Sequence, residues 1–131
     1  MANILFLAGS KSEDFEEYAN KTNPLPPCPD SPNCVRITKK IQVSKDVVFK
    51  AAKSALEKMG PIELKIIEAP PRIRAVFKVL IFKDDFVLLA EEETDSSSLI
   101  HIRSSSRVGQ SDLGVNRRRV KRFLKNLKRE I

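Results

Sequence analysis

The pattern of apolar and polar residues predicts a strand followed by a helix in the first part of the chain. Residues 35–43 (VRITKKIQV) are rich in β-branched residues and roughly alternate, which is typical of a strand. Ser44 is a candidate N-cap, and apolar residues then recur at helical spacing as far as Gly60-Pro61, where glycine and proline end the helix. This buried stripe consists of Val48, Phe49, Ala52, Ala55, Leu56 and Met59.

Alternation with a period of two predicts four more strands. The first covers residues 62–66, and after Pro70-Pro71 a longer strand places Ile73, Ala75, Phe77, Val79 and Ile81 on one face. A turn at Lys83-Asp84-Asp85 leads to a strand over 86–93, and a turn over 95–98 leads to a strand over 99–104. Because the connections are short, we expect antiparallel neighbours.

A second amphipathic helix closes the chain. Its apolar stripe consists of Val120, Phe123, Leu124, Leu127 and Ile131, and most of its basic residues face away from that stripe. The predicted fold class is therefore α+β, an antiparallel sheet of about five strands with two helices on one face, in the order β-α-β-β-β-β-α.

The N-terminal residues differ from the rest in composition. Residues 1–34 contain an acidic cluster and a proline-rich stretch, so we interpret them as an arm that precedes a single domain over 35–131. No signal peptide and no apolar run long enough to span a membrane is visible, which favours a cytoplasmic location.

The basic charge is concentrated at one end of the chain. The net charge is +7, and residues 116–131 alone hold eight basic residues and one acidic residue. A basic helix can grip a nucleic-acid backbone, but its only aromatic residue, Phe123, belongs to the apolar stripe. A solvated basic face and a nucleic-acid-binding surface that uses Lys121, Arg122, Lys125 and Arg129 both stay open.

The segment between the last strand and the last helix is the candidate site. It reads RSSSRVGQSDLGVNRRR over residues 103–119, and it is dense in hydrogen-bonding side chains. Arginines beside the open backbone N–H groups of a helix start are typical of anion sites. The candidate ligand-binding residues are Arg103, Arg107, Ser111, Asp112, Asn116 and Arg119.

Each of these residues has an expected role. The arginines would neutralise an anion, Ser111 would donate a hydrogen bond, and Asp112 or Asn116 would cap the helix. We expect Arg119 to turn towards the sheet while Arg118 stays in solvent. The alternative is a structural network that satisfies loop carbonyls, in which Glu91-Glu92-Glu93 on a neighbouring strand would offset the arginines.

The same segment resembles a known family. Its motif, R-S-x-S-R-x-G-x-S-D-x-G-x-N-R-x-R from Arg103 to Arg119, together with Pro32-Asn33-Cys34-Val35 and the Asp84-Asp85 pair, is similar to the family catalogued as domain of unknown function 1499. The resemblance spans residues 24–131 and implies no established activity, substrate or cofactor. Many members carry a membrane or export segment.

Few residues could support metal binding or catalysis. Cys28 and Cys34 could form a loop disulfide in an exported protein or stay reduced in the cytosol, and the lack of a visible signal favours the reduced form. With His101 as the only other soft ligand, we expect no metal site and no cofactor. A hydrolytic triad of His101 with nearby serines is disfavoured because no G-x-S-x-G turn is present.

The sequence thus favours a non-catalytic domain that binds an anionic small molecule or an acidic partner. A nucleic-acid-binding module is the main alternative, and an enzyme of unknown reaction is a further one. The oligomeric state and the ligand's identity cannot be read from these residues.

Overall fold

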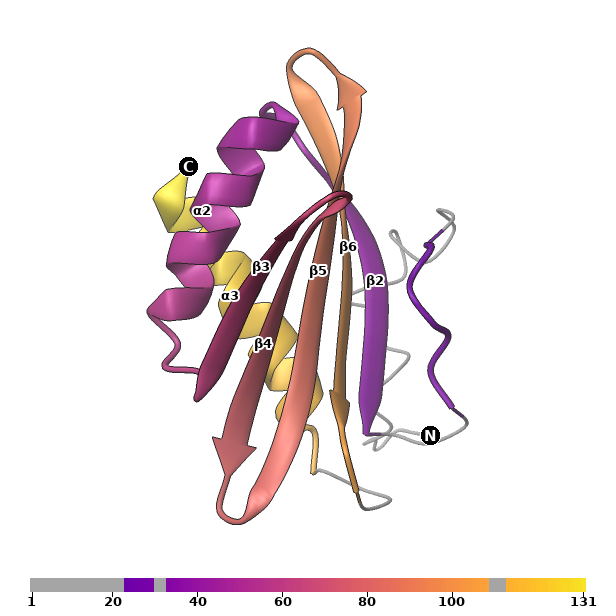
Figure 1. Ribbon diagram of the computed structural model, residues 1–131, viewed down its shortest axis with the longest axis vertical. Coiled ribbons are helices and arrows are strands. Elements are labelled where there is room, and N and C mark those ends of the chain that lie inside the picture. The colour runs from indigo at the N-terminus through magenta and orange to yellow at the C-terminus, as the bar shows by residue number, and fades with distance from the viewer. Residues whose placement is uncertain (1–22, 30–32, 109–112) are drawn as a thin grey trace.

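The computed structural model describes residues 23–29, 33–108 and 113–131. In chain order the elements are β2 (Cys34–Ile41), α2 (Lys45–Glu57), β3 (Glu63–Glu68), β4 (Pro71–Val79), β5 (Phe82–Thr94), β6 (Ser97–Ser106) and α3 (Val115–Glu130). The strands form one antiparallel sheet in the order β2-β6-β5-β4-β3, and Figure 1 shows both helices on one side of it. The predicted α+β fold and its element order are confirmed. The division into an arm over 1–34 and a domain over 35–131 stays a prediction.

Helix α2 begins and ends as its local sequence predicts. The Ser44 side chain accepts a hydrogen bond from the Val47 backbone N–H at 3.3 Å, so it acts as the N-cap. The helix is followed by Gly60 with a φ of 73°, a left-handed conformation that costs glycine little. Its buried face consists of Val48, Ala51, Ala52, Ala55 and Leu56.

The core lies between the helices and the inner face of the sheet. Phe86 is fully buried at its centre, with ring centroids 6.2 Å from Phe77 and 5.2 Å from Phe123. These three rings join β4, β5 and α3 through tilted and edge-on contacts, the arrangement that aromatic quadrupoles prefer. The predicted stripe of α3 therefore packs where expected, except that Ile131 is half exposed.

The turn between β4 and β5 is not where the sequence predicts it. We expected a turn at Lys83-Asp84-Asp85, but these residues lie inside β5 and the turn is formed by Leu80 and Ile81. The prediction was wrong because charged residues usually favour a turn, whereas here both aspartates are matched by arginines from elsewhere in the chain.

Candidate functional site

Asn116 is buried where α3 meets β6 and the residue that precedes β2. Its Nδ2 donates to the Asn33 carbonyl at 3.2 Å and to the Ser106 hydroxyl at 3.0 Å. Its Oδ1 accepts a hydrogen bond from the Ser104 hydroxyl at 2.6 Å. Both ends of the amide are thus satisfied without water, and Asn116 fixes the start of α3 against the sheet.

The expectation that Asn116 caps α3 is therefore wrong. The N-cap residue is Gly114, with a φ of 80° and no capping hydrogen bond from a side chain. Asn116 lies inside the helix, where its amide reaches inwards to the sheet rather than back to the first turn. Asp112, the other candidate cap, lies outside the described residues, as does Ser111.

Arg119 forms a buried ion pair under the first turns of α3. Its Nη1 donates to Asp84 Oδ2 at 2.7 Å and to Asn116 Oδ1 at 2.9 Å, and its guanidinium carbon lies 4.8 Å from the centre of the Phe77 ring. Arg119 is 9% exposed and Arg118 is exposed, which confirms that Arg119 turns towards the sheet. The cation is stabilised by a carboxylate and by an aromatic face.

The acidic partner of Arg119 is not the one that the sequence predicts. We expected Glu91-Glu92-Glu93, but Glu91 bonds to His101 and Glu93 pairs with Lys40. Because β5 pairs with β6 in antiparallel register, Asp84 lies opposite Ser106, just before the segment that leads to α3, whereas Glu91 lies opposite Leu99 at the far end. Strand direction thus decides which acidic group meets the arginines.

Arg107 pairs with Asp85 on the opposite face of the sheet. Two parallel hydrogen bonds of 3.0 Å join Arg107 Nε and Nη2 to the two carboxylate oxygens. The hydrogen bond and the charge of Asp85 raise the pKa of the Arg107 guanidinium above its ordinary value. Both side chains are partly exposed, so water screens this pair more than it screens the Arg119 pair.

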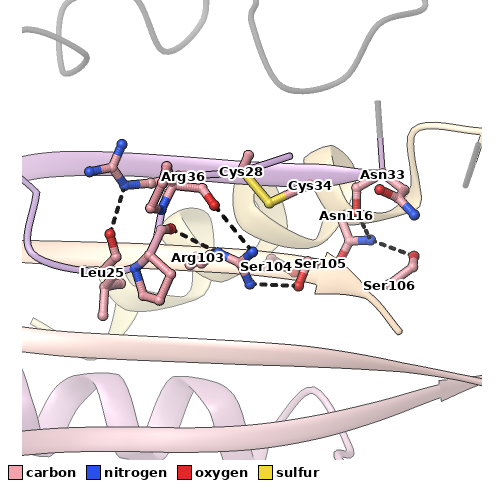
Figure 2. Close-up of a disulfide and its surroundings, with 12 residues drawn as sticks. Leu25, Cys28, Asn33, Cys34, Arg36, Arg103, Ser104, Ser105, Ser106 and Asn116 are labelled. Carbon is pink, nitrogen blue, oxygen red and sulfur yellow. Dashed lines mark hydrogen bonds between the residues drawn. A yellow bond between two sulfur atoms is a disulfide. The ribbon is translucent and has the colours of Figure 1, made fainter. Parts of the chain in front are cut away.

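Arg103 and its cross-strand neighbour Arg36 hold the segment 23–29 over the outer face of β2 and β6 (Figure 2). Arg103 donates to the carbonyls of Pro26 at 2.9 Å and Pro27 at 3.5 Å. Arg36 donates to the carbonyls of Leu25 at 3.1 Å and Asn23 at 2.6 Å. Arg103 therefore satisfies backbone carbonyls of a proline-rich segment, the role that the structural alternative assigned to it.

A disulfide between Cys28 and Cys34 closes the same segment onto the sheet. The two Cα atoms lie 5.6 Å apart, and Cys34 is the first, fully buried residue of β2 (Figure 2). The interpretation that favoured a reduced pair is therefore wrong. Sequence reasoning lacked the position of Cys28, which the arginine contacts at Pro26 and Pro27 bring next to β2.

The six candidate residues do not meet at one point. Asn116 and Arg119 are joined on the helix side of the sheet, whereas Arg103 and Arg107 make their contacts on the other side. Ser111 and Asp112 lie outside the described residues. Ligand binding by this set stays a prediction.

A basic hollow of about 400 Å³ opens beside Arg119. The hollow lies at a corner of the sheet, next to the end of α2. Pairing of β3 with β4 reaches only to Val76, so the last residues of β4 have no β3 residue beside them. The hollow is lined by Met59, Gly60, Phe77, Lys78, Val115, Arg118, Arg119 and Arg122. Among these lining residues four are cationic and none is acidic.

A second hollow, of about 520 Å³, lies over β3, β4 and β5 and includes Arg107. Its charged lining residues are of both signs: Glu63, Lys65, Arg74, Asp85 and Arg107. Because the acidic groups offset the basic ones, this hollow offers an anion less attraction than the basic hollow does.

A chain of three polar side chains was missed by sequence reasoning. His101 is fully buried, its Nδ1 lies 2.7 Å from the Thr38 hydroxyl, and its Nε2 lies 2.9 Å from Glu91 Oε1. A hydroxyl, an imidazole and a carboxylate in this order can serve nucleophilic catalysis. Thr38 is only 1% exposed, however, so no substrate can reach its hydroxyl. The chain is better explained as a satisfied network between β2, β6 and β5.

A metal-binding cluster and a membrane-spanning helix are both absent from the described part of the chain. No group of three or more His, Cys, Asp or Glu residues is placed to hold a metal ion there. None of the helices in residues 23–29, 33–108 and 113–131 is both long and apolar enough to cross a membrane.

The sequence of this two-layer α+β domain matches a known family. A family model described as "Protein of unknown function (DUF1499)" matches residues 24–127, and the chain belongs to that family. The resemblance carried by the motif from Arg103 to Arg119 is thereby confirmed. The comparison with curated proteins finds no match.

Several solved structures are similar to this chain at low sequence identity. The crystal structure of TTHA0849 from Thermus thermophilus has a TM-score of 0.43 and 13% identity, over 74% of this chain and 95% of that one. The di-domain ARO/CYC BexL from the BE-7585A biosynthetic pathway has a TM-score of 0.45 and 8% identity, over 74% and 43%. A START superfamily protein from Mycobacterium smegmatis has a TM-score of 0.41 and 12% identity, over 74% and 92%.

Proposed function

We propose that this domain binds a small anionic ligand in the basic hollow, without catalysis. The observation that carries the proposal is the convergence of four cations, Lys78, Arg118, Arg119 and Arg122, on one hollow in which no described lining residue is Asp or Glu. Asp84 already offsets the charge of Arg119, so Lys78, Arg118 and Arg122 leave an excess of positive charge around the hollow, and an anion relieves their mutual repulsion. Of the six residues predicted from the sequence, the proposed site contains Arg119, and its other residues come from α3, from β4 and from the residues that follow α2.

Arg119 is the best-positioned group for such a ligand. Its hydrogen bonds to Asp84 and Asn116 both use Nη1, which fixes the guanidinium plane against Phe77. The Nε and Nη2 atoms make no hydrogen bond to any described residue, so that edge of the guanidinium can serve a bidentate acceptor. A guanidinium held in place before binding loses little entropy when the ligand arrives.

The size and lining of the hollow define a ligand class. A volume of about 400 Å³ is at the small end of the range for ligand pockets, which suits a compact organic anion. Met59, Phe77 and Val115 supply an apolar wall beside the cations. We infer a ligand that bears a phosphate or carboxylate group on a short apolar body.

Native mass spectrometry of the protein purified gently from its own host is the first test. We expect a discrete added mass that disappears in the variant Lys78→Gln/Arg122→Gln, in which two exposed cations of the hollow are neutralised. The matched control is Lys125→Gln/Lys128→Gln, which removes the same charge from exposed positions outside the hollow. An added mass that survives in the first variant would contradict the proposed location.

Titration with inorganic phosphate and pyrophosphate, followed by NMR, tests the site without knowledge of the ligand. We expect the largest shifts at Arg118, Arg119 and Arg122, and affinity that weakens with salt because exposed charges are screened. Shifts confined to Arg103 or Arg107 would place the anion on the other face. Binding of DNA or RNA that depends on Lys121 and Lys125 rather than on Lys78 would favour the nucleic-acid alternative.

The disulfide bears on the compartment in which the domain acts. Cytosolic thiols are kept reduced, so the Cys28–Cys34 bond supports an oxidising compartment in place of the cytoplasm that the sequence favoured. The denatured mass of the same native sample provides the test, because a disulfide lowers the mass by two hydrogens. Two free thiols in protein handled with an alkylating agent would restore the cytoplasmic interpretation.

A further inference from the structure

The turn between β4 and β5 carries an apolar tip formed by Leu80, Ile81 and Phe82. Leu80 is 84% exposed, Ile81 82% and Phe82 47%. Pairing with β3 stops at Val76, and the last backbone hydrogen bond on the β6 side joins the Arg107 N–H to the Lys83 carbonyl at 3.0 Å. The turn itself therefore has no strand beside it (Figure 1). Three consecutive exposed apolar residues are unfavourable in water and point to a surface that they contact.

Leu80 also has an unusual backbone conformation for a leucine. Leu80 has a φ of 58°, the left-handed region in which glycine and asparagine are the favoured residues of tight hairpin turns. A leucine at this position costs backbone energy and contributes nothing to the core. Neither the turn nor the packing of the domain explains its side chain.

A second leucine at the same end of the molecule repeats this combination. Leu113 has a φ of 56° and is 79% exposed, just before α3 begins. Figure 1 shows the β4–β5 turn and the start of α3 at one end of the molecule, and Lys78 of β4 and Val115 of α3 line the same hollow. Two strained, exposed leucines thus lie on neighbouring segments.

The tip is bordered by positive charge. Lys78 and Lys83 are cross-strand partners directly behind it, and Arg118 lines the basic hollow together with Lys78. The two aspartates that follow Lys83 in β5, Asp84 and Asp85, are already paired with Arg119 and Arg107. An apolar tip with basic residues behind it is complementary to an anionic lipid surface, in which apolar side chains enter the interface and Lys and Arg meet the phosphates.

We infer that the β4–β5 tip docks this domain on the surface of a membrane that contains anionic lipids. A protein partner fits less well, because stable protein interfaces bury about 800 Å² on each side and a three-residue convex tip offers far less. Docking through the tip leaves the apolar stripe of α3 in the core, so the fold is not disturbed. The inference does not depend on the proposed ligand. Of the residues that carry it, Lys78 and Arg118 also line the basic hollow, whereas Leu80, Ile81, Phe82 and Lys83 do not.

Co-sedimentation with vesicles of equal parts phosphatidylcholine and phosphatidylserine tests the inference. We expect the wild type to bind these vesicles, and Leu80→Asn/Ile81→Asn to lose about tenfold or more in affinity because the apolar contribution is removed. Because asparagine tolerates the left-handed region, the variant should melt no lower than the wild type. The control is Val47→Asn, an apolar residue away from the tip that is 47% exposed, as Phe82 is, at the start of α2.

A paired charge experiment tests the lysines. Lys78→Gln/Lys83→Gln should weaken vesicle binding by about fivefold for each lysine that meets the surface. The control, Lys125→Gln/Lys128→Gln, removes the same charge from the second half of α3 and should have a much smaller effect. Equal losses in both variants would indicate attraction by net charge alone and would overturn docking through the tip.

A fluorescence experiment tests insertion directly. The chain contains no tryptophan, so Phe82→Trp introduces a single reporter at the tip and Val47→Trp introduces one away from it. We expect the emission of the tip reporter to shift to the blue with anionic vesicles, and not with vesicles of phosphatidylcholine alone. The Val47→Trp emission should stay unchanged with both.

Three results would overturn the inference. They are the absence of vesicle binding, vesicle binding that survives Leu80→Asn/Ile81→Asn, and an unshifted emission from Phe82→Trp in bound protein. Concentration-dependent dimers in sedimentation velocity that disappear in the tip variant would assign the tip to self-association. Phosphate binding in the basic hollow is measured separately, so loss of either proposal leaves the other testable.

Discussion

Asp84 and Asp85 are neighbours in β5, yet they serve opposite sides of the sheet. Asp84 points to the helices and forms a buried ion pair with Arg119, whereas Asp85 points to the other face and forms a partly exposed pair with Arg107. The chemistry of the two pairs is the same and their surroundings differ. Removal of a carboxylate that neutralises a buried cation therefore costs far more stability than removal of one that meets a cation in water.

Removal of the buried carboxylate should have the largest effect. Asp84→Ala leaves the cation of Arg119 buried without its partner, and we expect the free energy of unfolding to fall by about 3–5 kcal/mol in urea denaturation. The double variant Asp84→Ala/Arg119→Met should recover much of that loss because the charge is gone as well. A loss below that of Asp85→Ala would contradict the contrast between the two faces.

Removal of the Asn116 amide, which lies beside the Asp84–Arg119 pair, should have the next largest effect on stability. Asn116→Ala removes partners from Ser104, Ser106 and the Asn33 carbonyl, and we expect a loss of about 2 kcal/mol in the free energy of unfolding. Asn126→Ala on the same helix is the control, with an expected change within about 0.5 kcal/mol. Equal effects would mean that the network at the start of α3 contributes no special stability.

The exposed pair should matter little to stability. Asp85→Asn keeps the shape of the side chain and removes its charge, and we expect the melting temperature to stay within experimental error of the wild type. Because Asp85 raises the pKa of Arg107 by its hydrogen bond and charge, the pKa of that guanidinium should fall towards its ordinary value. A clear drop in melting temperature would show that the outer face carries more of the stability than its exposure indicates.

The smallest effect is expected for an ion pair on the helix side of the sheet that is not fully buried. It tests whether burial, rather than the face of the sheet, decides how much an ion pair contributes to stability. Lys58, which follows α2, pairs with Glu130 of α3 on the helix side, where the Lys58 side chain is exposed and that of Glu130 is partly exposed. The hydrogen bonds from Lys58 and then Ser54 lower the pKa of Glu130 below its ordinary value. This contribution is present at neutral pH and is lost as the pH falls through the lowered pKa. We expect Lys58→Gln to melt slightly below the wild type at neutral pH and to coincide with it in acid. A difference that grows in acid would reverse the sign of this argument.

The local sequence was sufficient for the elements whose signals are themselves local. Helix α2 begins and ends as its Ser44 and Gly60 predict, and the alternating strands were found because a sheet with one buried face imposes a period of two. The motif from Arg103 to Arg119 also sufficed for the family. The motif does not predict the geometry of the site, because Arg103, Arg107 and Arg119 each bond to a segment that is distant in sequence.

Only the tertiary structure decided where the charged residues and the β4–β5 turn lie. Arg119 meets Asp84 across 35 positions and Asn116 meets Asn33 across 83, so their partners depend on strand order and direction. Asp84 and Asp85, paired with Arg119 and Arg107, lie inside β5, and the turn is formed by Leu80 and Ile81. The sequence by itself determined the α+β fold and its family, since both are written in short-range patterns. The pairing of the arginines, the disulfide and the basic hollow were decided by folding, because they join residues that only the packed sheet brings together.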